Sequence, residues 1–234
     1  MAVPILLVQA TIMQGLISFF EGGSLTDRRG QNTLTNGATP ATFNATGGKP
    51  TGRATLIDKA YMTRVNGSLN ALDFGTKSFS VNVWIKPSGL PVVATRVIGQ
   101  GATAASDKGW RMRYVNIAGA GYVVCNISDG TTDYSGNNTA AASSGSWHMA
   151  TMVIDRGANL MRTYVDGAQG DSKSISGCGS LSPNSSDLFI GASTTLLGFV
   201  GDLASLGIWN RKLTPTDITN LYLAGAGLSY PFTR

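Results

Sequence analysis

The stretch SGSWHMATMVIDRGANLMRTYVDGAQ, residues 144–169, decides the predicted fold. Two apolar runs of strand length, WHMATMVI and LMRTYVDG, flank the connection DRGAN. Glycine and asparagine favour the backbone conformations of tight turns, so the stretch predicts a β-hairpin. The first run carries His148, the single histidine of the chain, and the role of this side chain bears on whether the protein is an enzyme.

Short apolar runs separated by Gly, Asn, Asp, Ser and Pro recur along the whole chain, which is typical of an all-β protein. In KSFSVNVWIKP, residues 77–87, apolar side chains occupy every second position and predict one buried face. Pro87 ends this run because proline cannot donate to a β-ladder. The predicted strands cover residues 15–20, 54–57, 60–65, 78–86, 92–98, 109–116, 121–127, 147–154, 160–166, 187–191 and 202–209.

One helix is predicted, over residues 214–225 (TPTDITNLYLAG). Thr214 can cap it, Pro215 takes the first helical position, Asp217 follows three residues after the cap, and Gly225 ends it. Many strands and one late helix predict an all-β fold, a two-sheet antiparallel sandwich with one short C-terminal helix.

The chain begins with an apolar arm, residues 1–14, ahead of a single domain over residues 15–234. The arm lacks a positively charged leader and a cleavage site, so neither a signal peptide nor membrane insertion is predicted. We expect an apolar strand that either covers the domain's own sheet edge or docks onto a neighbouring protein's sheet, with both alternatives open. The candidate docking residues are Val3, Ile5, Leu6, Leu7, Val8 and Ile12.

The charged residues, 18 basic and 13 acidic, are scattered along the chain. Arg28 with Arg29, Arg111 with Arg113, and Arg211 with Lys212 are the tightest basic groups, and no nucleic-acid partner is predicted from so dispersed a charge. Cys125 and Cys178 have no CxxC partner, which leaves two buried thiols or a single disulfide as alternatives.

Four motifs, at residues 74–87 (FGTKSFSVNVWIKP), 145–168, 188–193 (LFIGAS) and 199–222 (FVGDLASLGIWNRKLTPTDITNLY), occur in an order that resembles the concanavalin A-like lectin/glucanase superfamily. Within it, the chain is most similar to laminin-G-like and pentraxin-like domains. The resemblance implies a jelly roll of two curved antiparallel sheets, often used for glycan or protein recognition. It also implies that His148 belongs to the sandwich framework.

A non-enzyme is predicted. The glucanases of this superfamily carry their carboxylates in a Glu-x-Asp-x-x-Glu motif, and this chain has a single glutamate, Glu21. Nucleophilic catalysis by His148 would need a Ser or Cys and an orienting carboxylate, and no local signature indicates them. A polysaccharide hydrolase or lyase is the remaining enzymatic alternative.

Calcium is the one metal that the resemblance raises, because many relatives hold it near a sheet edge. Asp27 matches the family's early aspartate, whereas Ala204 and Ser205 replace later carboxylates and Asp202 is shifted by two residues. Since calcium needs about six to eight oxygen ligands, we predict no cofactor, with calcium at Asp27 and Asp202 as the alternative.

A ligand-binding face could be formed by aromatic and amide side chains in two loops, because sugars stack on aromatic rings and bind polar edges. In the alternative, Trp110 lies in the core and the polar residues only build turns. The candidate glycan-binding residues are Trp110, Tyr114, Asp129, Asp133, Tyr134, Asn137 and Asn138.

The predicted function is a non-catalytic binding or structural module on the surface of a virus particle, as a phage capsid decoration or fibre or tail component. Laminin-G-like folds occur among such phage proteins. Its partners would be other virion proteins or copies of itself, attached through the arm and a sheet edge, and cell-surface glycans. The alternative is a free, extracellular carbohydrate-binding lectin.

Overall fold

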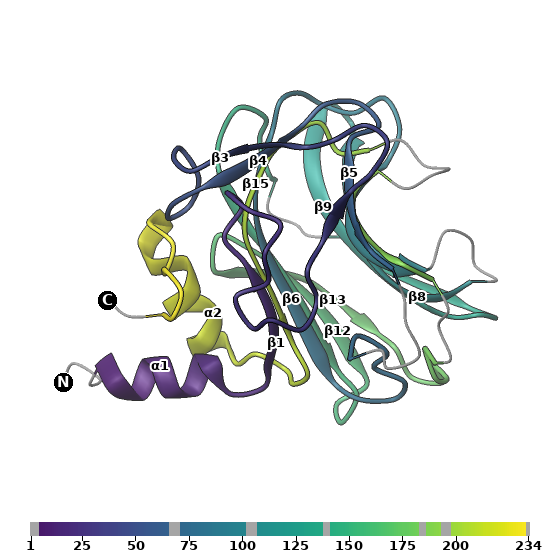
Figure 1. Cartoon of the computed structure of the whole chain (residues 1–234). Helices are drawn as coiled ribbons and strands as arrows, with labels where there is room; N and C mark the ends of the chain where they lie inside the picture. Colours follow the sequence, from purple (N-terminus) through teal and green to yellow (C-terminus); the bar gives the residue numbers. More distant parts are fainter. Residues whose placement is uncertain are drawn as a thin grey trace.

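Two antiparallel β-sheets, packed face to face, form the body of the protein in this computed structural model (Figure 1). The structure describes residues 5–65, 71–101, 107–137, 141–182, 186–192 and 198–232. The predicted all-β sandwich is confirmed. The eight-stranded sheet contains, in spatial order, β13 (Ala168–Ser174), β12 (Leu160–Val165), β11 (His148–Asp155), β6 (Phe79–Pro87), β15 (Gly201–Trp209), β4 (Arg53–Leu56) and β3 (Thr42–Asn44), and β1 (Leu16–Phe20) pairs with β15.

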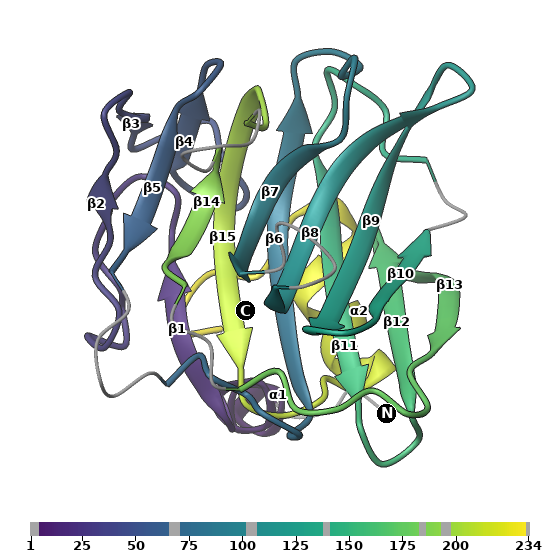
Figure 2. The same cartoon turned by 90° about the vertical axis from the view of Figure 1, so that its right-hand side faces the viewer.

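The second sheet has seven strands and faces the viewer in Figure 2. Each predicted strand range contains a strand, although the one predicted to begin at residue 92 begins at Thr95. In spatial order the seven strands are β10 (Asp133–Asn137), β9 (Ala120–Asp129), β8 (Lys108–Ile117), β7 (Thr95–Gly101), β14 (Leu188–Gly191), β5 (Tyr61–Arg64) and β2 (Thr35–Asn36). Four strands, β2, β3, β10 and β13, were not predicted, and all four lie at sheet edges.

Strand β6 lies inside the eight-stranded sheet and is buried on both faces. It pairs with β11 on one side and β15 on the other. The side chains of Phe79, Val81, Val83 and Ile85 enter the core between the sheets, as the alternation predicts. Trp84 points the opposite way and is only 2% exposed, so a second core must lie on the outer face of this sheet.

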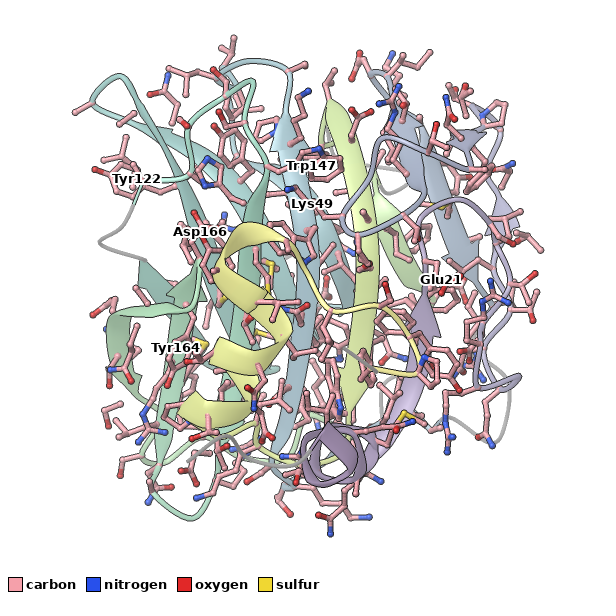
Figure 3. The ribbon with its side chains drawn as sticks, turned by 90° about the vertical axis from the view of Figure 1, so that its left-hand side faces the viewer. Glu21, Lys49, Tyr122, Trp147, Tyr164 and Asp166 are labelled. Carbon is pink, nitrogen blue, oxygen red and sulfur yellow. The ribbon has the colours of Figure 1, made fainter. Side chains whose placement is uncertain are left out.

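That second core is formed by the two helices and the C-terminal segment. Helices α1 (Ile5–Met13) and α2 (Pro215–Tyr222), with the 3₁₀ turn η1 (Leu223–Gly225), lie on the outer face of the eight-stranded sheet (Figures 1 and 3). The residues of this core are Ile12, Leu16, Phe19, Trp84, Met149, Val153, Tyr164, Ala204, Trp209, Leu213, Ile218, Leu221, Leu228 and Phe232.

Helix α2 begins as predicted, at Thr214. The Thr214 hydroxyl accepts a hydrogen bond from the backbone N–H of Asp217, and the Asp217 carboxylate accepts one from the backbone N–H of Thr214. This reciprocal pair satisfies two N–H groups that the helix itself cannot. At the other end Leu223, Ala224 and the predicted Gly225 all have positive φ, and α2 ends at Tyr222, before that glycine.

The N-terminal arm is helical, so the prediction of an apolar strand there is wrong. The nine residues ILLVQATIM, in which Gln9 and Thr11 interrupt the apolar residues, form α1. A short apolar run of this kind fits either a strand or a helix. The arm's end is held by its own domain: Trp209 Nε1 donates to the carbonyl of Ile12 at 2.8 Å, and Arg211 donates to the carbonyls of Thr11 and Gln14. The Ile12 side chain is fully buried in the second core.

The other predicted docking residues are only partly described. Val3 lies outside the described residues, and for Ile5, Leu6, Leu7 and Val8 the backbone alone is described. Within the described part of the chain, no helix is long and apolar enough to span a membrane.

Both cysteines are free thiols, which decides between the two alternatives left by the sequence. Cys125 lies in the core between the sheets, and burial raises the pKa of its thiol to about 12. Cys178 is half-buried, and burial also raises the pKa of its thiol. Neither thiol is therefore ionised at neutral pH.

Removing the helix cap tests the described start of α2. Thr214→Ala should lower the free energy of unfolding by about 1 kcal/mol, because the backbone N–H of Asp217 loses its acceptor and the Asp217 carboxylate loses the hydroxyl donor. Urea denaturation followed by circular dichroism measures this change. Thr219→Ala, which removes an exposed hydroxyl inside the same helix, is the matched control and should change stability by less than about 0.5 kcal/mol.

Truncating Ile12 tests whether the arm belongs to the domain. Ile12→Ala should lower the free energy of unfolding by about 2–5 kcal/mol, because a buried side chain leaves a cavity under Trp209. Gln14→Ala, on the exposed side of the same segment, should change it by less than about 0.5 kcal/mol. An Ile12→Ala protein as stable as the wild type would contradict the described packing.

Candidate functional site

The outer face of the seven-stranded sheet lies on the side of the molecule opposite to α1 and α2 (Figures 1 and 2). Side chains along β8 alternate across this sheet. Trp110, Met112 and Tyr114 enter the core between the sheets. Arg111 and Arg113 therefore point to the outer face.

A row of residues crosses this face at right angles to the strands. Arg111 on β8 is in register with Asn126 on β9 and with Gly99 on β7. Gly99 is in register with Phe189 on β14, and Phe189 with Thr63 on β5. The row thus joins a charged half, on β8 and β9, to an aromatic half, on β14 and β5.

A hydrogen-bonded network fills the charged half. Arg111 Nη2 donates to Asp133 Oδ2 at 3.0 Å, and Arg113 Nε donates to Asn126 Oδ1 at 3.0 Å. Asn126 Nδ2 donates to Asp133 Oδ1 at 3.4 Å. Asn126 is fully buried, whereas the Asp133 side chain is 28% exposed, so the network extends from the floor of the face to solvent.

Arg96 lies next to this network on β7, in register with Arg113. It is only 1% exposed, and its terminal nitrogens donate to the carbonyls of Gly99 and Gly101 at 3.4 and 3.1 Å. Burial, followed by the charges of Arg111 and Arg113, lowers the pKa of Arg96 to about 10. Burial also lowers the pKa values of Arg111 and Arg113.

The aromatic half consists of Phe189 and Tyr61, whose ring centroids lie 5.7 Å apart. Both side chains are half-buried. Gly99 separates them from Arg111, and a Cβ atom at Gly99 would lie 2.7 Å from the Arg111 Cβ. The floor between the aromatic and charged halves is therefore bare backbone.

The prediction that Trp110 and Tyr114 bind glycans is wrong, because both side chains belong to the core. Trp110 is 1% exposed and packs beside the rings of Phe74 and Phe79. Tyr114 is also 1% exposed, and its hydroxyl donates to the carbonyl of Ala142 at 2.9 Å. Neither ring can stack on a sugar, so the alternative weighed for Trp110 is the one that the structure supports.

The other predicted residues of this set separate onto different surfaces. Asp133 lies in the network on the outer face, whereas the Tyr134 ring packs partly against the core. Asp129 builds the turn between β9 and β10, where it accepts hydrogen bonds from Thr131, Thr132 and Gly179. Asn137 is described by its backbone alone, and Asn138 lies outside the described residues.

Asp27 and Asp202 do not form a calcium site. The Asp27 carboxylate accepts four backbone hydrogen bonds, from Phe19, Arg29, Gln31 and Asn32, and these N–H groups occupy the positions that a cation would need. Asp202, on β15, accepts from the Thr55 hydroxyl and faces Arg53. Within the described residues, no group of three His, Cys, Asp or Glu side chains could hold a metal ion.

His148 joins two segments of the framework. Its Nδ1 lies 2.7 Å from Asp166 Oδ2, and its Nε2 lies 3.0 Å from the Ser143 hydroxyl. The other oxygen of Asp166 accepts from the backbone N–H of Met149, which ties the turn after β12 to β11. Figure 3 shows Asp166 beside α2, on the face that the helices cover.

Ser143, His148 and Asp166 contact one another in the sequence that a nucleophile, a base and an orienting carboxylate would have. A hydrolase also needs a recess that holds its substrate. Three outer hollows of about 300, 330 and 380 Å³ are formed by described residues, and neither Ser143 nor His148 lines any of them. Through these contacts His148 ties the Ser143 segment and the turn after β12 to β11, as a framework residue would.

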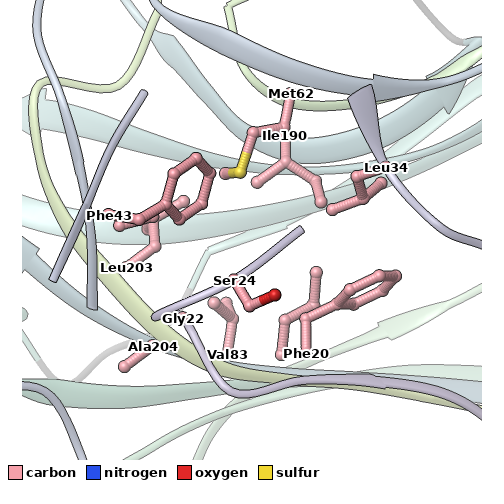
Figure 4. Close-up of a pocket in the computed structure, with 12 residues that line it drawn as sticks. Phe20, Gly22, Ser24, Leu34, Phe43, Met62, Val83, Ile190, Leu203 and Ala204 are labelled. Carbon is pink, nitrogen blue, oxygen red and sulfur yellow. The ribbon is translucent and has the colours of Figure 1, made fainter. Parts of the chain in front are cut away.

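The apolar pocket between the two sheets is a packing void (Figure 4). Its cavity measures about 20 Å³, room for about one water molecule. The lining is almost entirely apolar, so the pocket offers a ligand no hydrogen bond. The lining residues are Phe20, Gly22, Ser24, Leu34, Phe43, Ala54, Met62, Val83, Ile190, Leu203, Ala204 and Leu206.

The chain belongs to the concanavalin A-like lectin/glucanases superfamily, whose laminin-G-type sequence model matches residues 63–219. The resemblance found in the sequence is thus confirmed. Among the curated proteins compared with it, none matches the chain.

Similar solved structures share the fold at low sequence identity. Domain 4 of AbnA, a GH43 extracellular arabinanase from Geobacillus stearothermophilus in complex with arabinotriose, superposes with a TM-score of 0.67 and 18% identity, over 88% of this chain and 97% of that one. The botulinum neurotoxin serotype D ligand binding domain in complex with N-acetylneuraminic acid gives a TM-score of 0.70 and 15% identity, over 92% and 52%. The botulinum neurotoxin serotype G binding domain superposes with a TM-score of 0.69 and 19% identity, over 90% of this chain and 51% of that one. The chain thus spans about half the length of the neurotoxin binding domains.

The Asp129 turn predicts a pH-dependent stability. Hydrogen bonds from Thr131 and Gly179 hold the pKa of this carboxyl well below its usual range. A lowered pKa stabilises the fold above the unfolded value of about 3.9, and this contribution is lost as the pH falls through the folded value. Asp129→Ala should therefore cost about 1–2 kcal/mol at pH 7 and progressively less below about pH 4.

Chemical denaturation at pH 7, 5 and 3 measures the Asp129 effect. Asp58→Ala, which removes an exposed carboxylate from another loop, is the matched control and should change stability little at any pH. An Asp129→Ala effect that stays constant from pH 7 to pH 3 would contradict the described hydrogen bonds.

Proposed function

We propose that the protein is a carbohydrate-binding module that recognises sugars on the outer face of its seven-stranded sheet. One observation carries the proposal: a single cross-strand row places Phe189 beside the bare backbone of Gly99 and the donors of Arg111. Apolar C–H faces of a sugar ring pack on aromatic side chains, while its hydroxyl edge binds a few fixed polar groups. The row offers both within reach of one ligand.

Two of the similar solved structures support this proposal, because they are complexes with sugars, arabinotriose and N-acetylneuraminic acid. Binding domains of this fold therefore take carbohydrate ligands. For this chain the choice of face comes from its own residues: helices cover the outer face of the eight-stranded sheet, and the opposite sheet carries the polar row.

Substitution of Phe189 tests the proposed face. Phe189→Ala should weaken binding of a captured glycan about tenfold or more, because loss of an aromatic contact costs about 1.4 kcal/mol. A glycan array with the whole chain identifies the ligand, and isothermal titration calorimetry measures the dissociation constants. Trp110→Ala is not a useful variant, because the Trp110 ring is part of the core.

Trp147→Ala is the matched control for Phe189→Ala. Trp147 is a half-buried aromatic residue that packs against the second core, on the helix-covered side. This variant should keep the wild-type dissociation constant. The proposal fails if no glycan binds, or if Phe189→Ala binds as tightly as the wild type.

A place on the surface of a virus particle remains a prediction from the sequence, with a free extracellular lectin as its alternative. The sequence predicts that the protein attaches to the particle through its arm and a sheet edge. In the structure, the end of the arm is bound to its own domain through Ile12 and Trp209. Co-sedimentation of the chain with capsid or tail assemblies tests this prediction. A chain that binds glycans and never sediments with particles would favour the lectin.

A further inference from the structure

Three arginines gather on the charged half of the outer face. Arg96 on β7 is in register with Arg113 on β8. Arg111 lies two residues before Arg113, on the same side of β8. Arg96 and Arg111 are 1% and 6% exposed, and Arg113 is half-buried. Arginines are rarely enclosed to this degree unless paired.

Among the described residues, several guanidinium nitrogens of this cluster have no hydrogen-bond partner. The Nε atoms of Arg96 and Arg111 are buried and make no hydrogen bond. Arg113 donates through Nε to Asn126, and no contact within the described residues engages its two terminal nitrogens. A buried donor without an acceptor costs about 1–3 kcal/mol, so the unliganded face is incompletely satisfied.

The charges of the cluster are incompletely balanced as well. Its three guanidinium groups are attracted by two carboxylates, Asp133 and Asp107. Within the described part of this face, the one ion pair joins Arg111 to Asp133, at 3.0 Å. One further anionic group would leave the cluster neutral.

We propose that the cluster of Arg96, Arg111 and Arg113 binds the anionic group of an acidic sugar. The inference rests on the proposed function and names the class of sugar that this face selects. The planar guanidinium group of Arg113 presents two parallel N–H donors to a carboxylate or a sulfate. The sugar ring of such a ligand then extends over Gly99 toward Phe189, along the cross-strand row.

The experiment compares acidic sugars with uncharged partners of the same shape. The probes are the methyl glycosides of N-acetylneuraminic acid, galacturonic acid and glucuronic acid, each beside its carboxyl methyl ester, and galactose 6-sulfate beside galactose. Titration calorimetry with the whole chain should show at least one acidic probe binding ten times more tightly than its uncharged partner. The carboxylate and sulfate arms decide which oxyanion is preferred.

Substitution of Arg113 assigns that preference to the cluster. Arg113 is chosen because it is half-buried, whereas Arg96 and Arg111 are enclosed and their loss could unfold the protein. Arg113→Gln should weaken the preferred acidic probe at least tenfold and leave its uncharged partner unchanged. Arg113→Lys, which keeps the charge and loses the two parallel N–H donors, should give an intermediate loss of affinity for the acidic probe. Thermal melting of each variant verifies that it folds.

Arg29→Gln is the matched control, because it removes the same charge from an exposed position outside the cluster and should bind as the wild type does. Equal binding of acidic and uncharged probes, or an Arg113→Gln variant that keeps the preference, overturns the inference while the Phe189→Ala result still decides the proposed function. Absence of binding to every acidic and neutral sugar overturns both.

Discussion

The burial of β6 on both faces is the constraint on which the rest of the structure depends. One face of this strand completes the core between the sheets, and Trp84 on the other face needs a second core. The chain meets that need with its two ends: α1 from the N-terminus, and α2 with the C-terminal segment. Both helices thereby cover one sheet, and the outer face of the other sheet lies on the opposite side of the molecule (Figure 1).

The sequence predicted those parts of the fold in which local pattern and tertiary burial agree. Each predicted strand range contains a strand, and α2 starts at its predicted cap, because alternation and capping are local signals. The arm was mistaken for a strand because seven apolar residues, interrupted by Gln9 and Thr11, fit either a strand or a buried helix. Strands β10 and β13 were missed because edge strands such as DYSGN and AQGDSKS carry little apolar alternation.

The candidate site could be predicted far less well, because cross-strand register creates it. Arg96 lies far from Arg111 and Arg113 in the sequence, and only the pairing of β7 with β8 brings them together. A local signal did exist: in WRMRY, residues 110–114, aromatic and apolar residues alternate with two arginines. Because side chains alternate across a strand, burial of Trp110 and Tyr114 in the core would have placed both arginines on the other face.

The same alternation couples folding to recognition. A shift of one residue in the register of β8 would bring Arg111 and Arg113 into the core and expose the tryptophan and tyrosine, so the core holds the arginines on the outer face. The large apolar burial of Trp110, Met112 and Tyr114 opposes the cost of unpartnered guanidinium nitrogens on the other face. In β8 this alternation therefore places Trp110 and Tyr114 in the core and two arginines on the outer face.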